Sequence, residues 1–208
     1  MPQRNYKNDY PSVTEVLGVL RKFELELWFK NNTAKFCNEA SGKGKRIGTQ
    51  IHDAIQSYIE TGKAAVDTEY HEEVSNALQS FMLFCKHHPD IKMQRAEVAL
   101  TSEKYGYNGT VDCNAVNILL DWKTGNAKDA DAPKVYSEWR YQVAAYYKLW
   151  NEIMDNKVNK ALIVAVAKDK VAYSIEELFS NQLEEMFEEV FLPALKIANY
   201  KRMERRTK

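Results

Sequence analysis

Cysteine is scarce in this chain, and its few copies follow no spacing that a disulfide framework or a zinc site requires. The three cysteines, Cys37, Cys85 and Cys113, lie far apart in a sequence of 208 residues. Zinc sites need ligand pairs about two to five residues apart, and disulfide-stapled domains are short and rich in cysteine. The sequence therefore excludes both classes and predicts a reduced, cytoplasmic protein.

Net charge and long apolar runs are missing as well. The 29 lysine and arginine side chains balance the 29 aspartate and glutamate side chains. A protein that coats nucleic acid without specificity is usually basic, so the balance argues against such a coat but leaves room for local basic clusters. No apolar run approaches the ~20 residues of a membrane span, and the start of the chain is too polar for a signal peptide.

The chain does have enough apolar material for one folded domain, with 45% hydrophobic and 12% aromatic residues. Its length predicts a single domain over residues 1–208. A capping box at Ser12 and an apolar stripe that runs to Leu27 predict a first helix, which Asn31-Asn32 ends. The irregular stretch 33–45 contains Gly42-Lys43-Gly44, which predicts a mobile loop. Further helices are predicted at about 48–60 and 69–87.

The hydrophobic period changes after Pro89 and predicts a sheet. Strands are expected at about 96–100, 107–116, 118–123, 161–167 and 171–175, with a helix over 136–154 and a last helix over 177–200. We therefore predict an α/β protein with three parts: an N-terminal helical part (11–90), a sheet with one helix (91–176), and a C-terminal helix with a basic tail (177–208).

Two carboxylates and a lysine lie close together on the second and third expected strands. Asp121 and Lys123 alternate with apolar neighbours, so both side chains project to the same side, and Asp112 can lie across from them. Carboxylates beside a lysine at the end of an apolar strand suit a hard divalent cation together with a phosphate. An edge hairpin with solvated charges explains these three residues equally well.

Three further patterns accompany this one. Gly48 and His52 form GxxxH at the start of a helix, Gly109 precedes Asp112 as GxxD, and Gln142 and Tyr146 form QxxxY on another helix. With DxK at Asp121–Lys123, their order resembles the RecB-like branch of the PD-(D/E)xK nuclease superfamily. The segments Pro11–Thr14, Gly106–Asp112 and Asp121–Thr124 are most similar to the mitochondrial genome maintenance exonucleases and related phage exonucleases.

This resemblance implies a restriction-endonuclease-like core: a mixed central β-sheet flanked by helices, with N-terminal helices covering the active site. It also implies a metal-dependent DNA exonuclease that hydrolyses phosphodiester bonds in single-stranded DNA or at free DNA ends, in DNA repair or recombination. Asp112, Asp121 and Lys123 would be catalytic, and His52, Asp112 and Asp121 would bind one or two Mg²⁺ or Mn²⁺ ions. We expect no iron–sulfur cluster, because such relatives use four cysteines.

Other residues are assigned roles beside this centre. Gln142 and Tyr146 are expected to orient Lys123 or to bind nucleic acid, and Lys43, Lys45 and Arg46 are expected to contact DNA phosphates. Glu97 has two open interpretations, a metal contact through water or a simple ion pair with Arg95.

The expected partner is DNA, with single strands preferred and no membrane involved. The chain is expected to act as a monomer in the cytoplasm of a bacterium or a phage-infected host cell, and replication or recombination proteins are further candidate partners. A duplex endonuclease of restriction type and a catalytically inactive DNA-binding module are the alternative functions.

Overall fold

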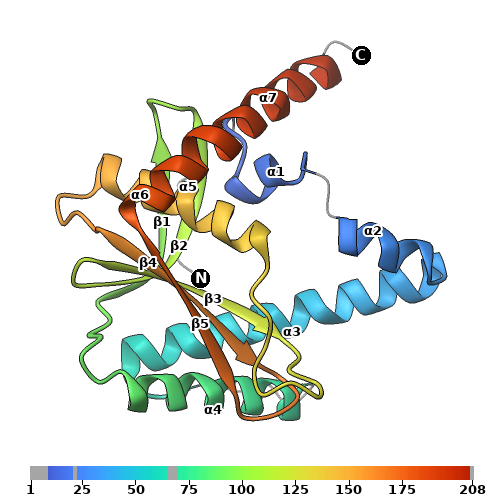
Figure 1. Cartoon of the computed structure of the whole chain (residues 1–208), viewed down its shortest axis with the longest axis vertical. Coiled ribbons are helices and arrows are strands. Elements are labelled where there is room, and N and C mark those ends of the chain that lie inside the picture. The colour runs from blue at the N-terminus through green and yellow to red at the C-terminus, as the bar shows by residue number, and fades with distance from the viewer. Residues whose placement is uncertain (1–8, 21–22, 65–69, 207–208) are drawn as a thin grey trace.

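A five-stranded mixed sheet forms the centre of the computed structural model, which describes residues 9–20, 23–64 and 70–206. The strands lie side by side in chain order (Figure 1). They are β1 (Arg95–Ser102), β2 (Tyr107–Ala115), β3 (Ile118–Gly125), β4 (Lys160–Ala167) and β5 (Tyr173–Phe179). Neighbouring strands are antiparallel except β3 and β4, which are parallel and joined by a crossover through helix α5 (Ser137–Ile153). The predicted α/β class with a mixed, helix-flanked sheet is confirmed.

Helices cover both faces of the sheet and enclose two separate apolar cores (Figure 1). One core lies between the sheet and helices α3 (Ala34–Thr61) and α4 (His71–His87). The other lies between the sheet and α5, together with α1 (Val13–Leu17), α6 (Ser180–Met186), the π-helix η1 (Phe187–Phe191) and α7 (Leu192–Arg206). Because β4 lies between the two cores, it is apolar and buried from its second residue, Ala161, to Ala167.

The first predicted helix is wrong in its extent. Helix α1 ends at Leu17, and a separate helix, α2 (Phe23–Lys30), follows after a break. Gly18 caps α1, and its amide donates to carbonyls of the preceding turn. Leu27, which the periodicity placed on the buried stripe, is 42% exposed.

The predicted loop over residues 33–45 is also wrong, because helix α3 begins at Ala34 and continues without interruption to Thr61. Thr33 caps its first turn by accepting a hydrogen bond from the Phe36 amide at 3.3 Å. Each glycine inside a helix costs only about 1 kcal/mol relative to alanine, so Gly42 and Gly44 weaken the helix without ending it. The start of the helix predicted near residue 69 lies outside the described residues.

The last predicted helix begins too early, because Glu177 and Leu178 belong to β5. From Ser180 onward the chain is helical to Arg206, so the described part of the basic tail is helical as well. Among the described residues, no helix is both long enough and apolar enough to cross a bilayer.

Candidate active site

The candidate site lies where strands β2 and β3 separate. Their antiparallel pairing stops at Cys113 and Leu120, one step before Asp112 would face Asp121. Beyond this point a side chain replaces the backbone ladder: the Trp122 amide donates a hydrogen bond to Oδ2 of Asp112 at 2.8 Å. The carboxylate of Asp112 therefore lies at the opening between the two strands.

A twist of β2 accompanies this separation. Tyr107 and Val111 belong to the core beneath α5, whereas Cys113 and Ala115 belong to the core beneath α3 and α4. Alternate residues of a strand normally share one face, so the face presented by β2 changes at Asp112. Asp112 therefore lies at the boundary between the two cores.

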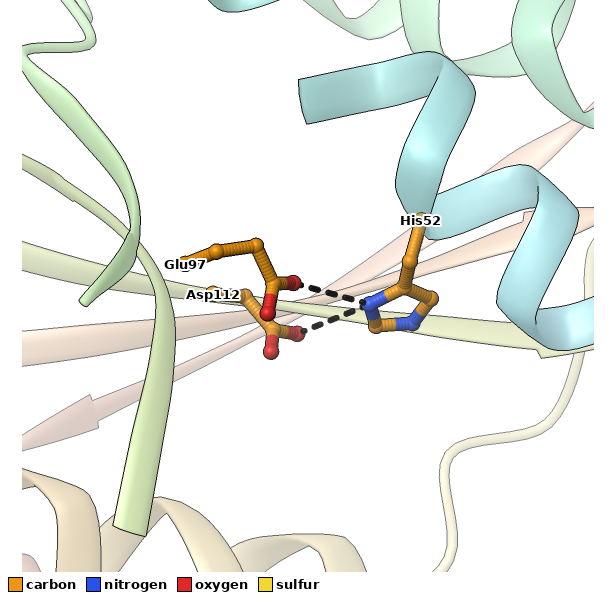
Figure 2. A group of neighbouring side chains, drawn as sticks. All are labelled: His52, Glu97 and Asp112. Carbon is orange, nitrogen blue, oxygen red and sulfur yellow. Dashed lines mark ion pairs between the residues drawn. The ribbon is translucent and has the colours of Figure 1, made fainter. Parts of the chain in front are cut away.

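Glu97 of β1 lies opposite Asp112 and has a left-handed backbone. Its φ is 52°, a conformation that costs a residue other than glycine about 1–3 kcal/mol. The pairs on either side, Ala96 with Cys113 and Val98 with Val111, keep their register. The strain is therefore confined to Glu97, whose side chain points toward His52 (Figure 2).

Helix α3 brings His52 to this point from the other side. Its Nδ1 lies 3.7 Å from Oε1 of Glu97 and 3.7 Å from Oδ2 of Asp112 (Figure 2). One ligand atom from each of these three side chains lies within 4.8 Å of the others. An imidazole nitrogen and two carboxylates at this separation form a suitable set of donors for a divalent cation.

The pKa of His52 is raised above its ordinary value. Burial disfavours the imidazolium, but the neighbouring charges of Asp112 and Glu97 outweigh that effect, while Lys123 opposes them. The two carboxylates therefore favour a positive charge at this position. A bound cation would supply that charge and leave His52 neutral, the form in which histidine binds metals.

Asp121 and Lys123 form an ion pair on the same side of β3, as their alternation predicts. Asp121 is only 2% exposed, and its Oδ1 accepts no hydrogen bond from the described residues. Burial raises the pKa of Asp121 to about 6, against the opposing effect of Lys123. A buried carboxylate oxygen without a donor is costly, and coordination of a cation would remove that cost, so the residues present fit a metal.

Gly109, Gln142 and Tyr146 shape the site without being placed against the His52 cluster. A Cβ atom added at Gly109 would lie 2.9 Å from Leu149 and 3.0 Å from Tyr146. The glycine therefore lets α5 pack directly on β2. Gln142 donates a hydrogen bond to the Tyr146 hydroxyl at 2.8 Å, so the two motif residues hold each other. Their proposed contacts to Lys123 or nucleic acid stay predictions.

The three basic residues predicted to contact phosphates fall into two groups: two contact the start of α4, and the third is exposed on the face of α3 that carries His52. Lys43 forms an ion pair with Glu73 at 2.9 Å, and Arg46 donates a hydrogen bond to the Tyr70 hydroxyl at 3.0 Å. These contacts attach α3 to the start of α4. Lys45 is exposed and lies two helical turns before His52, on the same face of α3. Of the three, Lys45 is the residue that shares a face of α3 with His52, and its phosphate contact stays a prediction.

Glu97, for which the sequence left two interpretations open, and the Trp122 amide, to which it gave no role, are further candidate groups at this site. The alternation of Glu97 with apolar neighbours predicted a strand, but a strand pattern carries no sign of a left-handed residue. The Trp122 amide can bind Asp112 only because β2 and β3 separate at this point, and no pattern of residues in the sequence predicts that separation. Glu97 could have been chosen from its position opposite Asp112, had the register of β1 been known.

Comparison with solved structures identifies the class of fold. A candidate exonuclease from Eubacterium rectale is similar over 97% of this chain and 87% of its own, with a TM-score of 0.59 and 14% identity. An alkaline exonuclease from Laribacter hongkongensis aligns over 96% of this chain and 93% of its own, with a TM-score of 0.45 and 12% identity. No protein-family model and no curated protein matches the sequence. The fold expected from the four motifs, a mixed sheet flanked by helices, is therefore shared with this candidate exonuclease, and at 14% identity the likeness concerns the fold.

Proposed function

We propose that this protein is a metal-dependent DNA exonuclease that hydrolyses phosphodiester bonds in single-stranded DNA or at free DNA ends. The observation that carries the proposal is the convergence of His52, Glu97 and Asp112, with the Asp121–Lys123 ion pair on the adjacent strand. This set of groups lies on a fold shared with a candidate exonuclease.

His52, Asp112 and Asp121 would hold Mg²⁺ or Mn²⁺, with Glu97 as a further donor. The imidazole nitrogen is a softer ligand than a carboxylate and shifts the preference toward Mn²⁺. When bound, the cation would neutralise charge on the scissile phosphate and acidify a water molecule. The Trp122 amide holds Asp112 in place, so this carboxylate is oriented before any cation binds.

Lys123 would act on the attacking water or on the phosphate. Its side chain is 13% exposed and held by Asp121, which restricts the ammonium group to the side of the sheet where the acids project. An ammonium group has three donors and no acceptor, so it can orient a water molecule and stabilise negative charge that develops on phosphate oxygens.

The experiment that tests this function uses single strands of one sequence in two forms. Purified protein with Mn²⁺ or Mg²⁺ is offered end-labelled linear DNA and closed circular DNA. We expect digestion of the linear strand alone, and we expect Asp112→Asn and Lys123→Ala to lose that activity. Cutting of circles would indicate an endonuclease, and binding without cleavage of either form would indicate an inactive DNA-binding module.

A further inference from the structure

We infer that the junction of α2 and α3 is a second DNA-contact site, an aromatic platform on which bases of an entering single strand stack. We call it the aromatic corner and define it as Trp28, Phe29 and Phe36. The inference rests on the proposed function and adds to it a place where the unreacted part of the strand is held. It therefore makes a free, unpaired strand the preferred substrate.

The aromatic corner exposes ring surface that the fold does not use. The Trp28 ring lies 5.1 Å from Phe29 and 6.1 Å from Phe36, measured between centroids. Phe29 is 45% exposed and Phe36 is 51% exposed. Clustered and half-exposed rings are a liability in a soluble protein unless they bind something.

Helix α2 has few packing partners in the rest of the fold. Together with the first turns of α3, it extends away from the sheet (Figure 1). Leu25 and Leu27 of α2 are 43% and 42% exposed. Among the described residues, α2 makes only marginal contact with other helices and strands. Its apolar side chains therefore contribute little to the two cores of the domain.

A polar face of α3 leads from the first turns of the helix to the candidate active site. Asn38, Ser41, Lys45 and His52 are three, four and seven residues apart, so they form one stripe along the helix. The first three are exposed, and none of the four is acidic. A stripe with one lysine and no carboxylate can run beside phosphates without repelling them.

The length of α3 sets the distance between the two sites. Phe36 and His52 belong to the same uninterrupted helix, so they are separated by about 24 Å along its axis at 1.5 Å per residue. That distance corresponds to roughly seven stacked nucleotides at about 3.4 Å each. A short oligonucleotide bound at the active site therefore ends before the aromatic corner, and a longer one reaches it.

Single-stranded DNA fits the aromatic corner better than a protein partner does. Bases stack on aromatic side chains with little regard to sequence, which suits an enzyme that degrades a strand from its end. Lys30 and Lys35 are both exposed and lie at the two ends of the turn between α2 and α3. The rings are thus accompanied by cations and lie at the start of the helix whose acid-free stripe leads to His52.

The test compares the double variant Phe29→Ala/Phe36→Ala with the control Phe179→Ala. Phe179 is 52% exposed and lies at the end of β5, outside the aromatic corner. Binding of labelled oligothymidines of about four and about twelve nucleotides is measured by fluorescence anisotropy in EDTA, so that no cleavage occurs. We expect the double variant to bind the longer strand roughly 5- to 100-fold more weakly, the range for loss of base stacking, and the shorter strand unchanged.

Further measurements distinguish the inference about the aromatic corner from the proposed nuclease function. With Mn²⁺ present, the double variant should keep the parent's kcat on the short strand, because the chemistry lies elsewhere. If the parent cleaves both strands and the double variant binds both as the parent does, the aromatic corner is overturned while the nuclease function stands. If the parent binds long strands through the corner but cleaves nothing, the function fails and the corner stands. Self-association of the parent that the double variant loses, with unchanged DNA affinity, would instead make the corner a contact between two copies of this chain and overturn the inference.

Discussion

At the scale of single residues, the candidate site gathers groups that each oppose folding. Asp121 is a buried carboxylate with an oxygen that accepts no hydrogen bond from the described residues, and Glu97 has a left-handed backbone inside a strand. Such features persist where the surrounding structure holds them and where function needs them. Removing them should therefore lower activity and raise stability.

Asp121→Asn should abolish cleavage and stabilise the metal-free protein at pH 8. An acid whose pKa is raised in the folded state, here to about 6, holds its proton more tightly there than in the unfolded chain. Ionisation therefore opposes folding, and this penalty is complete above about pH 6 and absent below the ordinary pKa of about 4. We expect a gain of about 1–3 kcal/mol at pH 8 that shrinks as the pH falls to 4. Urea unfolding in EDTA at several pH values measures it, and a constant difference between the two proteins would contradict the assignment.

Glu97 offers a matched pair of variants. Glu97→Ala removes the carboxylate and keeps the strained backbone, whereas Glu97→Gly removes the carboxylate and also suits a φ of 52°. We expect both variants to need more Mn²⁺ for half-maximal cleavage, and only the glycine variant to gain stability, by about 1 kcal/mol. Thermal unfolding in EDTA and a metal titration of activity separate the two effects. An unchanged metal requirement in both variants would remove Glu97 from the metal site.

At the scale of elements, the two motif glycines have different tasks. Gly109→Ala should destabilise the protein by about 1–3 kcal/mol, because its Cβ would lie 2.9 Å from Leu149 and 3.0 Å from Tyr146 and would push α5 away from β2. Gly48→Ala is the control, since its Cβ would lie 3.7 Å from Oγ1 of Thr124, an ordinary contact, and alanine favours a helix. Denaturant unfolding of both variants tests this difference. Equal destabilisation of the two would mean that the close packing of α5 on Gly109 is unimportant.

Experiments should also distinguish a basic residue of α3 that contacts DNA from one that stabilises the fold. Lys45→Gln should weaken single-stranded DNA binding and reduce the slope of affinity against log salt concentration by roughly 0.7, the value for one phosphate contact. Arg46→Gln, whose side chain is bonded to Tyr70, should leave that slope unchanged and lower the unfolding free energy. Anisotropy titrations at several salt concentrations decide between them. A salt slope that Arg46→Gln reduces and Lys45→Gln leaves unchanged would assign the phosphate contact to Arg46.

The pattern of the sequence predicted the elements of the sheet and their chemistry better than the helices at the start of the chain. Asp121 and Lys123 share a side because a strand has a period of two residues, and this rule does not depend on the rest of the fold. The continuity of α3 through Gly42 and Gly44 does depend on it, because contacts of Lys43 and Arg46 with α4 hold that part of the helix. The backbone of Glu97 and the separation of β2 from β3 arise from twist in the sheet, which local periodicity does not encode.

At the scale of the whole molecule, the candidate metal donors join parts of the chain that pack separately. His52 comes from α3, whereas Glu97, Asp112 and Asp121 come from three strands. A cation that binds only the folded state stabilises it by RT ln(1 + [L]/Kd), or about 2.7 kcal/mol at 100 times Kd. We expect Mn²⁺ to raise the Tm of the parent and to have much less effect on Asp112→Asn. Asp53→Asn, an exposed neighbour of His52 with the same charge change, is the control and should respond as the parent does.

The parallel pairing of β3 with β4 has a consequence for how the protein is made. The groups of the candidate site have all been synthesised once Lys123 is reached, yet the strand that carries Asp121 and Lys123 gains its second neighbour only with residues 160–167. Since parallel strands require the intervening crossover, a nascent chain that ends inside α5 has β3 at an open edge and lacks the strand that pairs with Asp121 and Lys123 in the full chain. We therefore expect hydrolytic activity to arise late in synthesis, after the polypeptide has committed to its full sheet. Incomplete products of translation would then carry the candidate metal donors and Lys123 and leave the DNA of the cell intact.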